Sequence, residues 1–176
     1  MINSKANNKN YKQGNYIPVN KDKVMKLNTN GGVYFRSSWE KRIMTWLDNK
    51  SDILMWGAEC LKIPYQMTHF DNGDMRVKEH CYYPDFYYEM QLSDGTRKRV
   101  VVEVKPMKEY QNVIDLNEGK MNVPKDGTLK KLKSFEYDLK QAQKNREKWK
   151  TMISWCDKKG YEFIIITEIH LKKFGI

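Results

Sequence analysis

A nearly continuous run of Tyr, Phe and Ile at residues 161–167 limits what this chain can fold into more than any other segment. A strand that is apolar on both faces is typical of the interior of a sheet covered on both sides. A second strand is expected at residues 97–105. Its alternating side chains place Val100, Val102 and Val104 on one face, and Val101, Glu103 and Lys105 on the other. Together these segments predict a sheet with helices packed against it.

A capping box predicts the first helix, with Ser37 as the N-cap and Glu40 as the third helical residue. This helix should end near Asn49. Strands are then expected, in chain order, at residues 53–56, 61–65, 82–92 and 97–105. Pro64 should close the second of these strands. The turn residues 93–96 should join the last two strands as a hairpin.

The C-terminal part of the chain carries a second helical pattern, which starts at Thr128 and stops at Gly160. That span is long for one helix, so we expect a break near residues 143–145, with Asn145 as a second N-cap. Residues 168–176 are expected to form a short helix. The order of helix, strands, hairpin, long helix and strand predicts an α/β fold around a mixed sheet.

The chain of 176 residues is long enough for one ordinary domain and too short for two. Residues 1–33 are rich in Asn and Lys and are expected to form a basic, partly extended arm. Residues 34–176 should form the single domain. Within it, residues 106–127 show weak periodicity and two prolines, so a long loop is expected there.

The charge balance favours a polyanionic partner, because 32 basic residues exceed 22 acidic ones and the net charge is +10. No apolar stretch approaches the length that a membrane span requires, and the first residues do not resemble a secretory signal. Three cysteines without CxxC spacing make a disulfide scaffold improbable. A zinc site built from Cys60, His69, His80 and Cys81 is not expected either, because the ligand spacing is absent.

The candidate site begins with the triplet Glu103-Val104-Lys105. An acid-x-Lys triplet occurs five times in the chain and is not specific by itself. Only this triplet lies inside a β-branched strand, where a solvated charge is not expected by default. Glu103 and Lys105 are two residues apart, so both side chains leave the same face of the strand.

A second carboxylate would come from Asp85, which follows Pro84 on the neighbouring strand. Two carboxylates and a backbone carbonyl, here that of Val104, suffice to hold Mg²⁺, or Mn²⁺ in its place. A metal held in this way polarises a phosphodiester and lowers the pKa of the attacking water. Lys105 would orient that water and offset charge in the transition state.

This site requires a particular hairpin register. A two-residue turn at Asp94-Gly95 would put Asp85 opposite Val104, on the wrong side of the sheet. A three-residue turn, with Gly95 in the left-handed conformation, would put Asp85 opposite Glu103. We therefore predict the three-residue turn or an equivalent bulge.

These motifs resemble the PD-(D/E)XK nuclease superfamily, whose restriction-endonuclease-like core has the order αβββαβ, a mixed central sheet flanked by helices. The resemblance is closest to the head-completion nucleases of large contractile-tailed phages, and TnsA-type transposon endonucleases share the core pattern. The motifs that carry it are Tyr34-Phe35-Arg36-Ser37-Ser38-Trp39-Glu40, Trp46-Leu47-Asp48, Trp56-Gly57-Ala58-Glu59, Ile63-Pro64-Tyr65, Tyr83-Pro84-Asp85-Phe86, Glu103-Val104-Lys105-Pro106, Asn145, Lys148-Trp149 and residues 163–168.

The resemblance implies a catalytic set of Glu40, Asp85, Glu103 and Lys105. Asp85 and Glu103 would bind the metal, and Glu40 would complete the network around the water or a second metal. DNA contacts are expected from Arg36, Tyr83, Lys144, Asn145 and Lys148. The resemblance also implies trimming of DNA ends during virion assembly, with phage head or portal proteins as partners. The setting would be the cytoplasm of an infected host cell, or the virion itself.

Each candidate residue also has a purely structural interpretation. Glu40 could serve only the capping box, and Asp85 could be an ordinary turn acid. Glu103 and Lys105 could be an ion pair on an exposed sheet. Lys140, Lys144, Lys148 and Lys150 are typical of a solvated helix face as well as of phosphate contacts. Two functional alternatives stay open: a DNA-binding protein of the phage head or portal that does not cleave, and a transposon-type endonuclease subunit.

Overall fold

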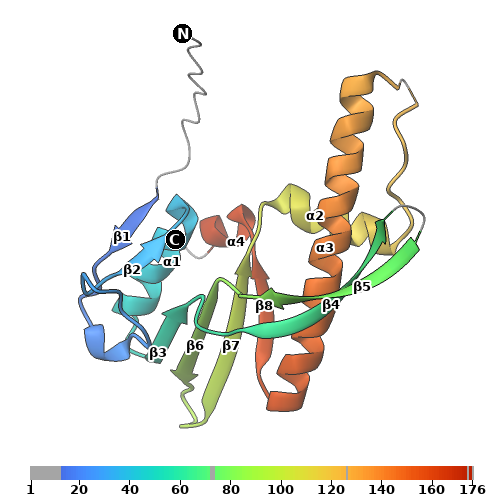
Figure 1. Cartoon of the computed structure of the whole chain (residues 1–176). Coiled ribbons are helices and arrows are strands. Elements are labelled where there is room, and N and C mark those ends of the chain that lie inside the picture. Colours follow the sequence, from blue (N-terminus) through green and yellow to red (C-terminus); the bar gives the residue numbers. More distant parts are fainter. Residues whose placement is uncertain (1–12, 72–73, 126, 174, 176) are drawn as a thin grey trace.

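The computed structural model describes residues 13–71, 74–125, 127–173 and 175, so the first twelve residues of the predicted arm lie outside the described part. The core follows one helix, three strands, a helix and a strand (Figure 1). These elements are α1 (Ser38–Asn49), β3 (Ile53–Ala58), β6 (Phe86–Gln91), β7 (Arg97–Val104), α3 (Leu129–Lys159) and β8 (Glu162–Ile166). The predicted α/β fold with the αβββαβ order is confirmed.

The central sheet has the strand order β3-β6-β7-β8, in which only the β7–β8 pair is parallel. The apolar segment at residues 161–167 was predicted to lie in the sheet interior, and this is wrong, because β8 is an edge strand of this sheet and β7 is interior. Its composition has another cause. Ile164 and Ile166 pack into the core on one face of β8, while Phe163 and Ile165 pack on the other face.

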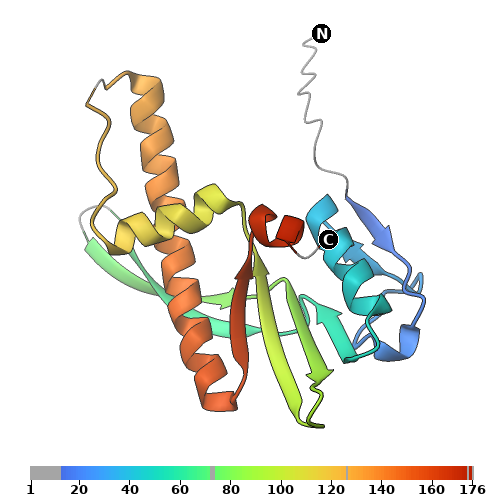
Figure 2. The same cartoon turned by 180° about the vertical axis from the view of Figure 1, so that it is seen from behind.

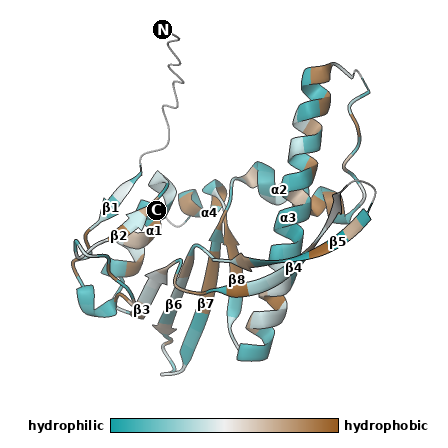
Figure 3. Cartoon of the chain, in the orientation of Figure 1, coloured by the Kyte–Doolittle hydropathy of each residue, from teal (hydrophilic) through white to brown (hydrophobic). Residues whose placement is uncertain are grey.

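Helices cover both faces of the sheet, as Figures 1 and 2 show from opposite sides. Ile43, Met44 and Leu47 of α1 pack against Val100 and Val102 of β7, together with the short helix α4 (Glu168–Lys173). On the opposite face, Val101 packs against Met152 and Cys156 of α3. The predicted alternation along β7 is therefore confirmed, and hydrophobic residues concentrate on the sheet while α3 is mostly hydrophilic (Figure 3).

A long hairpin is inserted between β3 and β6. It consists of β4 (Ile63–Asp71) and β5 (Asp74–Tyr82), which pair along their whole length and cross α3 (Figure 1). Pro64 does not close a strand as predicted: it lies inside β4, opposite Cys81, and a two-stranded ribbon tolerates its missing N–H on an outer edge. The predicted strand at 82–92 is likewise divided, since Tyr82 ends β5 and Phe86 starts β6.

Two predictions about the C-terminal half are wrong. Residues 106–127 are not one long loop, because α2 (Met107–Asn117) occupies their first half and packs on α3 through Val113 and Tyr110. The second helix has no break at residues 143–145, and α3 runs unbroken for 31 residues. Asn145 is an interior residue rather than an N-cap. It lies three residues after Ala142 and four before Trp149, so it continues the buried stripe of the helix.

The helix boundaries that depend on capping residues agree with the sequence. Ser37 is the N-cap of α1, and its hydroxyl accepts the Glu40 backbone N–H. Gly160 ends α3 with a left-handed φ of 66°, and the short helix predicted after residue 167 is α4. None of the helices within the described ranges is long and apolar enough to cross a membrane.

Residues 13–33 pack against the domain. The strand β1 (Gly14–Tyr16) pairs with β2 (Val33–Phe35), and a 3₁₀ turn, η1 (Lys21–Lys23), lies between them. The fully buried Asp48 of α1 holds this segment by accepting hydrogen bonds from the Tyr16 hydroxyl and from the N–H groups of Val19 and Asn20. Burial and the Asp48 charge raise the pKa of Tyr16 to about 12.

Replacing Asp48 should release this N-terminal segment. We expect Asp48→Ala to lower the free energy of unfolding by about 2 kcal/mol, because three hydrogen bonds to one carboxylate are lost together. The exposed Asp52→Ala is the matched control and should change stability by less than about 0.5 kcal/mol. Urea denaturation measures both values. Equal stability of the two variants would show that the Asp48 contacts do not hold the segment.

Candidate active site

The candidate site lies where β7 ends, on the face that α3 covers. Glu103 is 2% exposed, and each of its two carboxylate oxygens has a polar partner. The Tyr82 hydroxyl donates to one oxygen at 2.6 Å, and the Lys105 ammonium lies 2.9 Å from the other. The exposed-sheet ion pair considered from the sequence is therefore not what forms, because this pair is enclosed between the sheet and α3.

Asp85 reaches the same place from the start of β6. Its Oδ2 accepts the backbone N–H of Val104 at 2.6 Å. Burial and the negative charge of Glu103 raise the pKa of Asp85 to about 8, although the Val104 N–H and Lys105 act in the opposite direction. The two acids therefore lie close enough to repel each other, as a pair of ligands for one cation must.

The hairpin turn brings Asp85 into this position. Phe86 pairs with Val102 and Gln91 with Arg97, which is the register of a three-residue turn. Leu92 and Thr96 close that turn by a backbone hydrogen bond, and Gly95 has a φ of 82°. The predicted turn and register are confirmed. One residue beyond the last Phe86 pair, this register places Asp85 opposite Glu103.

The Val104 backbone is oriented toward Asp85 rather than toward β8. The N–H of the following residue, Lys105, donates to the carbonyl of Ile166 in β8, so the N–H of Val104 points to the β6 side and meets Asp85. In an extended strand the N–H and C=O of one residue point to the same side. The Val104 carbonyl is therefore directed to the side on which Asp85 lies.

Two lysines contribute positive charge to the site. Burial lowers the pKa of Lys105, but the charges of Glu103 and Asp85 outweigh burial and leave this pKa raised, so the side chain stays an ammonium. Lys148 of α3 lies over the Tyr82 ring, with its Nζ 4.9 Å from the ring centre. Burial and the nearby charges of Lys105 and Lys144 lower the pKa of Lys148, against the pull of Glu103.

Glu40 lies at the edge of this group. Its carboxylate accepts the Ser37 hydroxyl and the Arg36 N–H, both at 2.9 Å, so the capping interpretation is correct as far as it goes. Its charge also acts on Asp85 and on Arg36. Glu40 therefore caps α1 and contributes to the field of the site, although no direct contact with Asp85 or Glu103 is recorded among the described residues.

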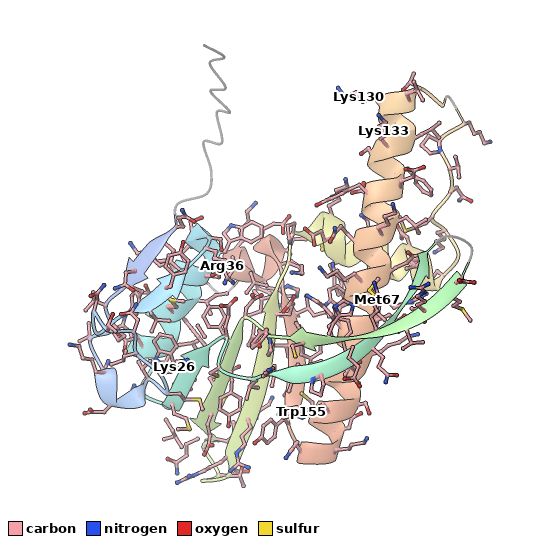
Figure 4. All side chains as sticks on the ribbon, viewed as in Figure 1. Lys26, Arg36, Met67, Lys130, Lys133 and Trp155 are labelled. Atoms are coloured by element: carbon pink, nitrogen blue, oxygen red, sulfur yellow. The ribbon has the colours of Figure 1, made fainter. Side chains whose placement is uncertain are left out.

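Arg36 and Glu59 form an ion pair beside the site, and the Arg36 side chain is well exposed (Figure 4). The Glu59 bond and the charges of Glu40 and Asp85 raise the pKa of Arg36 against the effect of burial. Glu59 adopts a left-handed φ of 45° and its N–H donates to the Asp85 carbonyl. The backbone of Glu59, in its strained conformation, therefore fixes the backbone at Asp85, and the side chain of Glu59 holds Arg36.

The other predicted DNA contacts differ in their accessibility. Tyr83 is 46% exposed, and Lys144 is exposed in a cleft of about 570 Å³ between α3 and the β4–β5 hairpin. Lys148 lines the same cleft, as does Met67, which is labelled in Figure 4. Asn145 is 4% exposed and donates to Glu109 of α2, so the structure does not bring it to the surface with the lysines.

The sequence pattern alone does not reveal the contacts of two of these residues. Tyr82 looks like one more aromatic of a strand, and only the fold shows that its hydroxyl binds Glu103. Glu59 belongs to a motif that carries the family resemblance, but its contacts with Arg36 and Asp85 depend on the connection between β3 and β4. A tyrosine separated from the triplet by a whole hairpin offers no local spacing from which its partner could be predicted.

The donor set fits a divalent cation bound by oxygen. Asp85 and Glu103 are adjacent acids whose mutual repulsion a cation would relieve, and the Val104 carbonyl is directed toward them. Within the described residues, no group of three or more His, Cys, Asp or Glu side chains is placed to hold a metal. A site with two carboxylates leaves the remaining positions to water, which Mg²⁺ retains readily.

Comparisons with known proteins place the chain in a family. The family described as TnsA-like endonuclease N terminal matches residues 50–168, a range that contains Asp85, Glu103 and Lys105. The chain belongs to the TnsA-like endonuclease family. The head completion nuclease of Enterobacteria phage T4 is 30% identical over 143 residues, which span 81% of this chain and 83% of the phage protein. No solved structure matches the chain.

Membership of the TnsA-like endonuclease family confirms the resemblance found in the sequence and supports a nuclease function. The family match begins at residue 50, so it includes neither Glu40 nor Arg36. The phage relative accounts for a larger part of the chain than the family match does.

The raised pKa of Asp85 predicts how stability depends on pH. The folded protein holds a proton on Asp85 up to about pH 8, whereas the unfolded chain loses it near the ordinary value of 3.8. The metal-free protein should therefore lose stability as the pH rises between these values. Glu103→Gln removes one cause of the shift and should weaken this dependence. Thermal unfolding in EDTA from pH 4 to 9 measures it, and parallel curves for both proteins would contradict the coupling.

Proposed function

We propose that this chain is a metal-dependent deoxyribonuclease that hydrolyses phosphodiester bonds at the end of β7. The observation that carries the proposal is the convergence of Asp85, Glu103 and Lys105 in a chain that belongs to an endonuclease family. Mg²⁺, or Mn²⁺ in its place, would be held by Asp85, Glu103 and the Val104 carbonyl. When bound, it would polarise the phosphodiester and lower the pKa of a water molecule.

The side chains around the metal ligands have separate roles in this proposal. Tyr82 and Lys105 fix the Glu103 carboxylate, and the Val104 N–H fixes that of Asp85. Because the Lys105 ammonium stays charged, it can hold the attacking water and offset negative charge that develops on the phosphate. Glu40 would complete the network that orients this water.

DNA would approach this site between two groups of cations. Arg36 offers a guanidinium on the α1 side, and Lys144 and Lys148 offer ammonium groups in the cleft beside α3. Tyr83 is exposed next to Pro84 and Asp85, where its ring can flank the DNA backbone. A DNA contact by Asn145 has less support, because its side chain is buried against Glu109.

The biological role that we propose is the trimming of DNA ends during the assembly of a phage head. The support is the length of the match to the T4 protein, which covers most of both chains. In this role the partners would be head or portal proteins and the setting the cytoplasm of an infected cell. A transposon endonuclease subunit is the alternative, and the family match favours it only over residues 50–168.

A head protein that binds DNA without cleaving it explains the site less well. Two adjacent acids repel each other and the phosphate backbone, so a protein that only binds DNA gains nothing from them. Burial and, after it, the charge of Glu103 raise the pKa of Asp85, so two ionised acids are costly at this place. A bound divalent cation removes that cost, which gives the pair a function in a nuclease.

Two substitutions test the nuclease. We expect Asp85→Asn and Lys105→Ala each to reduce Mg²⁺-dependent cleavage of supercoiled and linear DNA by about 100-fold or more, because each removes a group beside the reacting phosphate. DNA binding in EDTA should change little. Lys98→Ala is the matched control, since Lys98 lies on the same strand and pairs with the partly exposed Glu162 far from the acids.

Lys98→Ala should cleave like the wild type. Binding of DNA by all four proteins, with no cleavage by any of them in Mg²⁺ or Mn²⁺, would reject the nuclease and favour the binding protein. Cleavage that persists in Asp85→Asn and Lys105→Ala would place the active site elsewhere.

A further inference from the structure

The N-terminal half of α3 extends beyond the sheet, with residues 118–125 running beside it (Figures 1 and 2). Leu132, Phe135 and Leu139 are half-buried on one side of this half, and Leu132 lies next to Gly127. These three residues mark the apolar side of the projecting helix. The opposite side remains open, and it carries lysines.

These lysines form one continuous row. At 100° per residue, six positions of α3 between residues 130 and 148 lie within an arc of about 80°. They are Lys130, Lys133, Tyr137, Lys140, Lys144 and Lys148. The acidic residues of α3, all of which the structure describes, fall outside this arc. Lys150 also falls outside this arc. It therefore lies on another side of the helix from Lys140, Lys144 and Lys148, although all four were considered together as candidate phosphate contacts. We call these six residues the α3 stripe.

The α3 stripe leads to the candidate active site. Its lower end is Lys148, which lies over Tyr82 and within the electrostatic field of Glu103 and Asp85. Lys140 and Lys144 line the cleft between α3 and the β4–β5 hairpin. Lys130 and Lys133 lie at the projecting end of the helix (Figure 4). At 1.5 Å per residue, the row from Lys130 to Lys148 is about 27 Å long.

Acids do not neutralise the α3 stripe within the described residues. Lys108 pairs with Asp138 and Lys120 with Glu118, whereas no ion pair is recorded for Lys130, Lys133, Lys140 or Lys144 among those residues. Lysines three and four apart on a helix repel one another, so the row is unfavourable for the isolated protein. Such a row becomes favourable when a polyanion lies along it.

We propose that the α3 stripe binds the phosphate backbone of DNA on one side of the scissile bond and so guides the DNA end into the active site. This proposal rests on the proposed nuclease function, in which DNA is the substrate. It adds the position of the DNA on the surface of the protein. A length of 27 Å matches about eight base pairs at 3.4 Å each. Tyr137, 63% exposed between the lysines, offers a ring that can pack on a sugar or an unpaired base.

The test compares two triple variants that lose the same charge. The stripe variant carries Lys130→Ala, Lys133→Ala and Lys140→Ala, none of which we place at the reacting phosphate. The matched variant carries Lys26→Ala, Lys62→Ala and Lys150→Ala, which are exposed and lie outside the row. Binding in EDTA is measured over a range of salt concentrations, with a duplex of about 20 base pairs and a single strand of that length, both longer than the stripe.

We expect the stripe variant to bind DNA at least about tenfold more weakly than the matched variant at low salt. The slope of log affinity against log salt should become less steep, by about 2.7 for duplex DNA or by about 2.1 for a single strand. If only one of the two DNA forms shows this full change in slope, that form is the one that the stripe binds. Equal affinities and slopes for the two variants would overturn the proposal. Circular dichroism should show the same helix content in both.

Cleavage by the wild type separates this proposal from the nuclease function. Loss of binding in the stripe variant, with no cleavage by the wild type in Mg²⁺ or Mn²⁺, would support the stripe and reject the nuclease. Cleavage by the wild type, with equal binding by both triple variants, would support the nuclease and reject the stripe. In a nuclease guided by the stripe, the variant should have a raised KM and an unchanged kcat.

Discussion

The hydrogen bond from the Val104 N–H to the Asp85 carboxylate is the contact on which the arrangement of the site depends. It joins the first residue before β6 to the end of β7, and it exists only because the hairpin between these strands has three turn residues. A turn shorter by one residue would move every side chain of β6 to the other face. Asp85 would then face away from Glu103, and the two acids could not share a cation.

Around this contact, the protein balances charges that are costly when they are alone. Glu103 is buried but has a phenol and an ammonium as partners. Burial and the charge of Glu103 raise the pKa of Asp85 despite its backbone donor, so a proton or a cation must compensate its charge. Lys105 and Lys148 sit next to the acids, and the α3 stripe carries the positive charge outward. In the proposed function, these lysines let a polyanion approach despite the acids at the centre of the site.

Local chemistry explains what the sequence predicts well. Ser37 and Gly160 mark helix ends because capping and left-handed backbone are properties of single residues. The turn at Gly95 could be predicted because only one register puts both acids on one face. The position of β8 could not, since burial of both faces produces the same apolar pattern in an interior strand and in a covered edge strand. The helix α2 has Met107, Tyr110 and Ile114 at helical spacing, but Pro106, Gly119 and Pro124 favour a loop across the segment as a whole.

Long-range pairing explains the rest of the site that the sequence does not reveal. Tyr82 and Glu103 are 21 residues apart, and the bond between them depends on where the β4–β5 hairpin ends. Asn145 looks like a cap because asparagine is common there, but Glu109 of α2 satisfies its amide in the helix interior. The role of Asn145 therefore depends on α2, a helix that lies where a loop was predicted.

The central claim is that Asp85 and Glu103 bind a divalent cation, and proton release on metal binding tests it most directly. At pH 7 the metal-free protein should hold a proton on Asp85, whose pKa is raised to about 8. Isothermal titration with Mg²⁺ in two buffers of different ionisation enthalpy measures the protons released. The account predicts release of most of one proton per ion in the wild type, and no such release in Asp85→Asn. Mg²⁺ binding without proton release, or equal binding by Asp85→Asn, would contradict it.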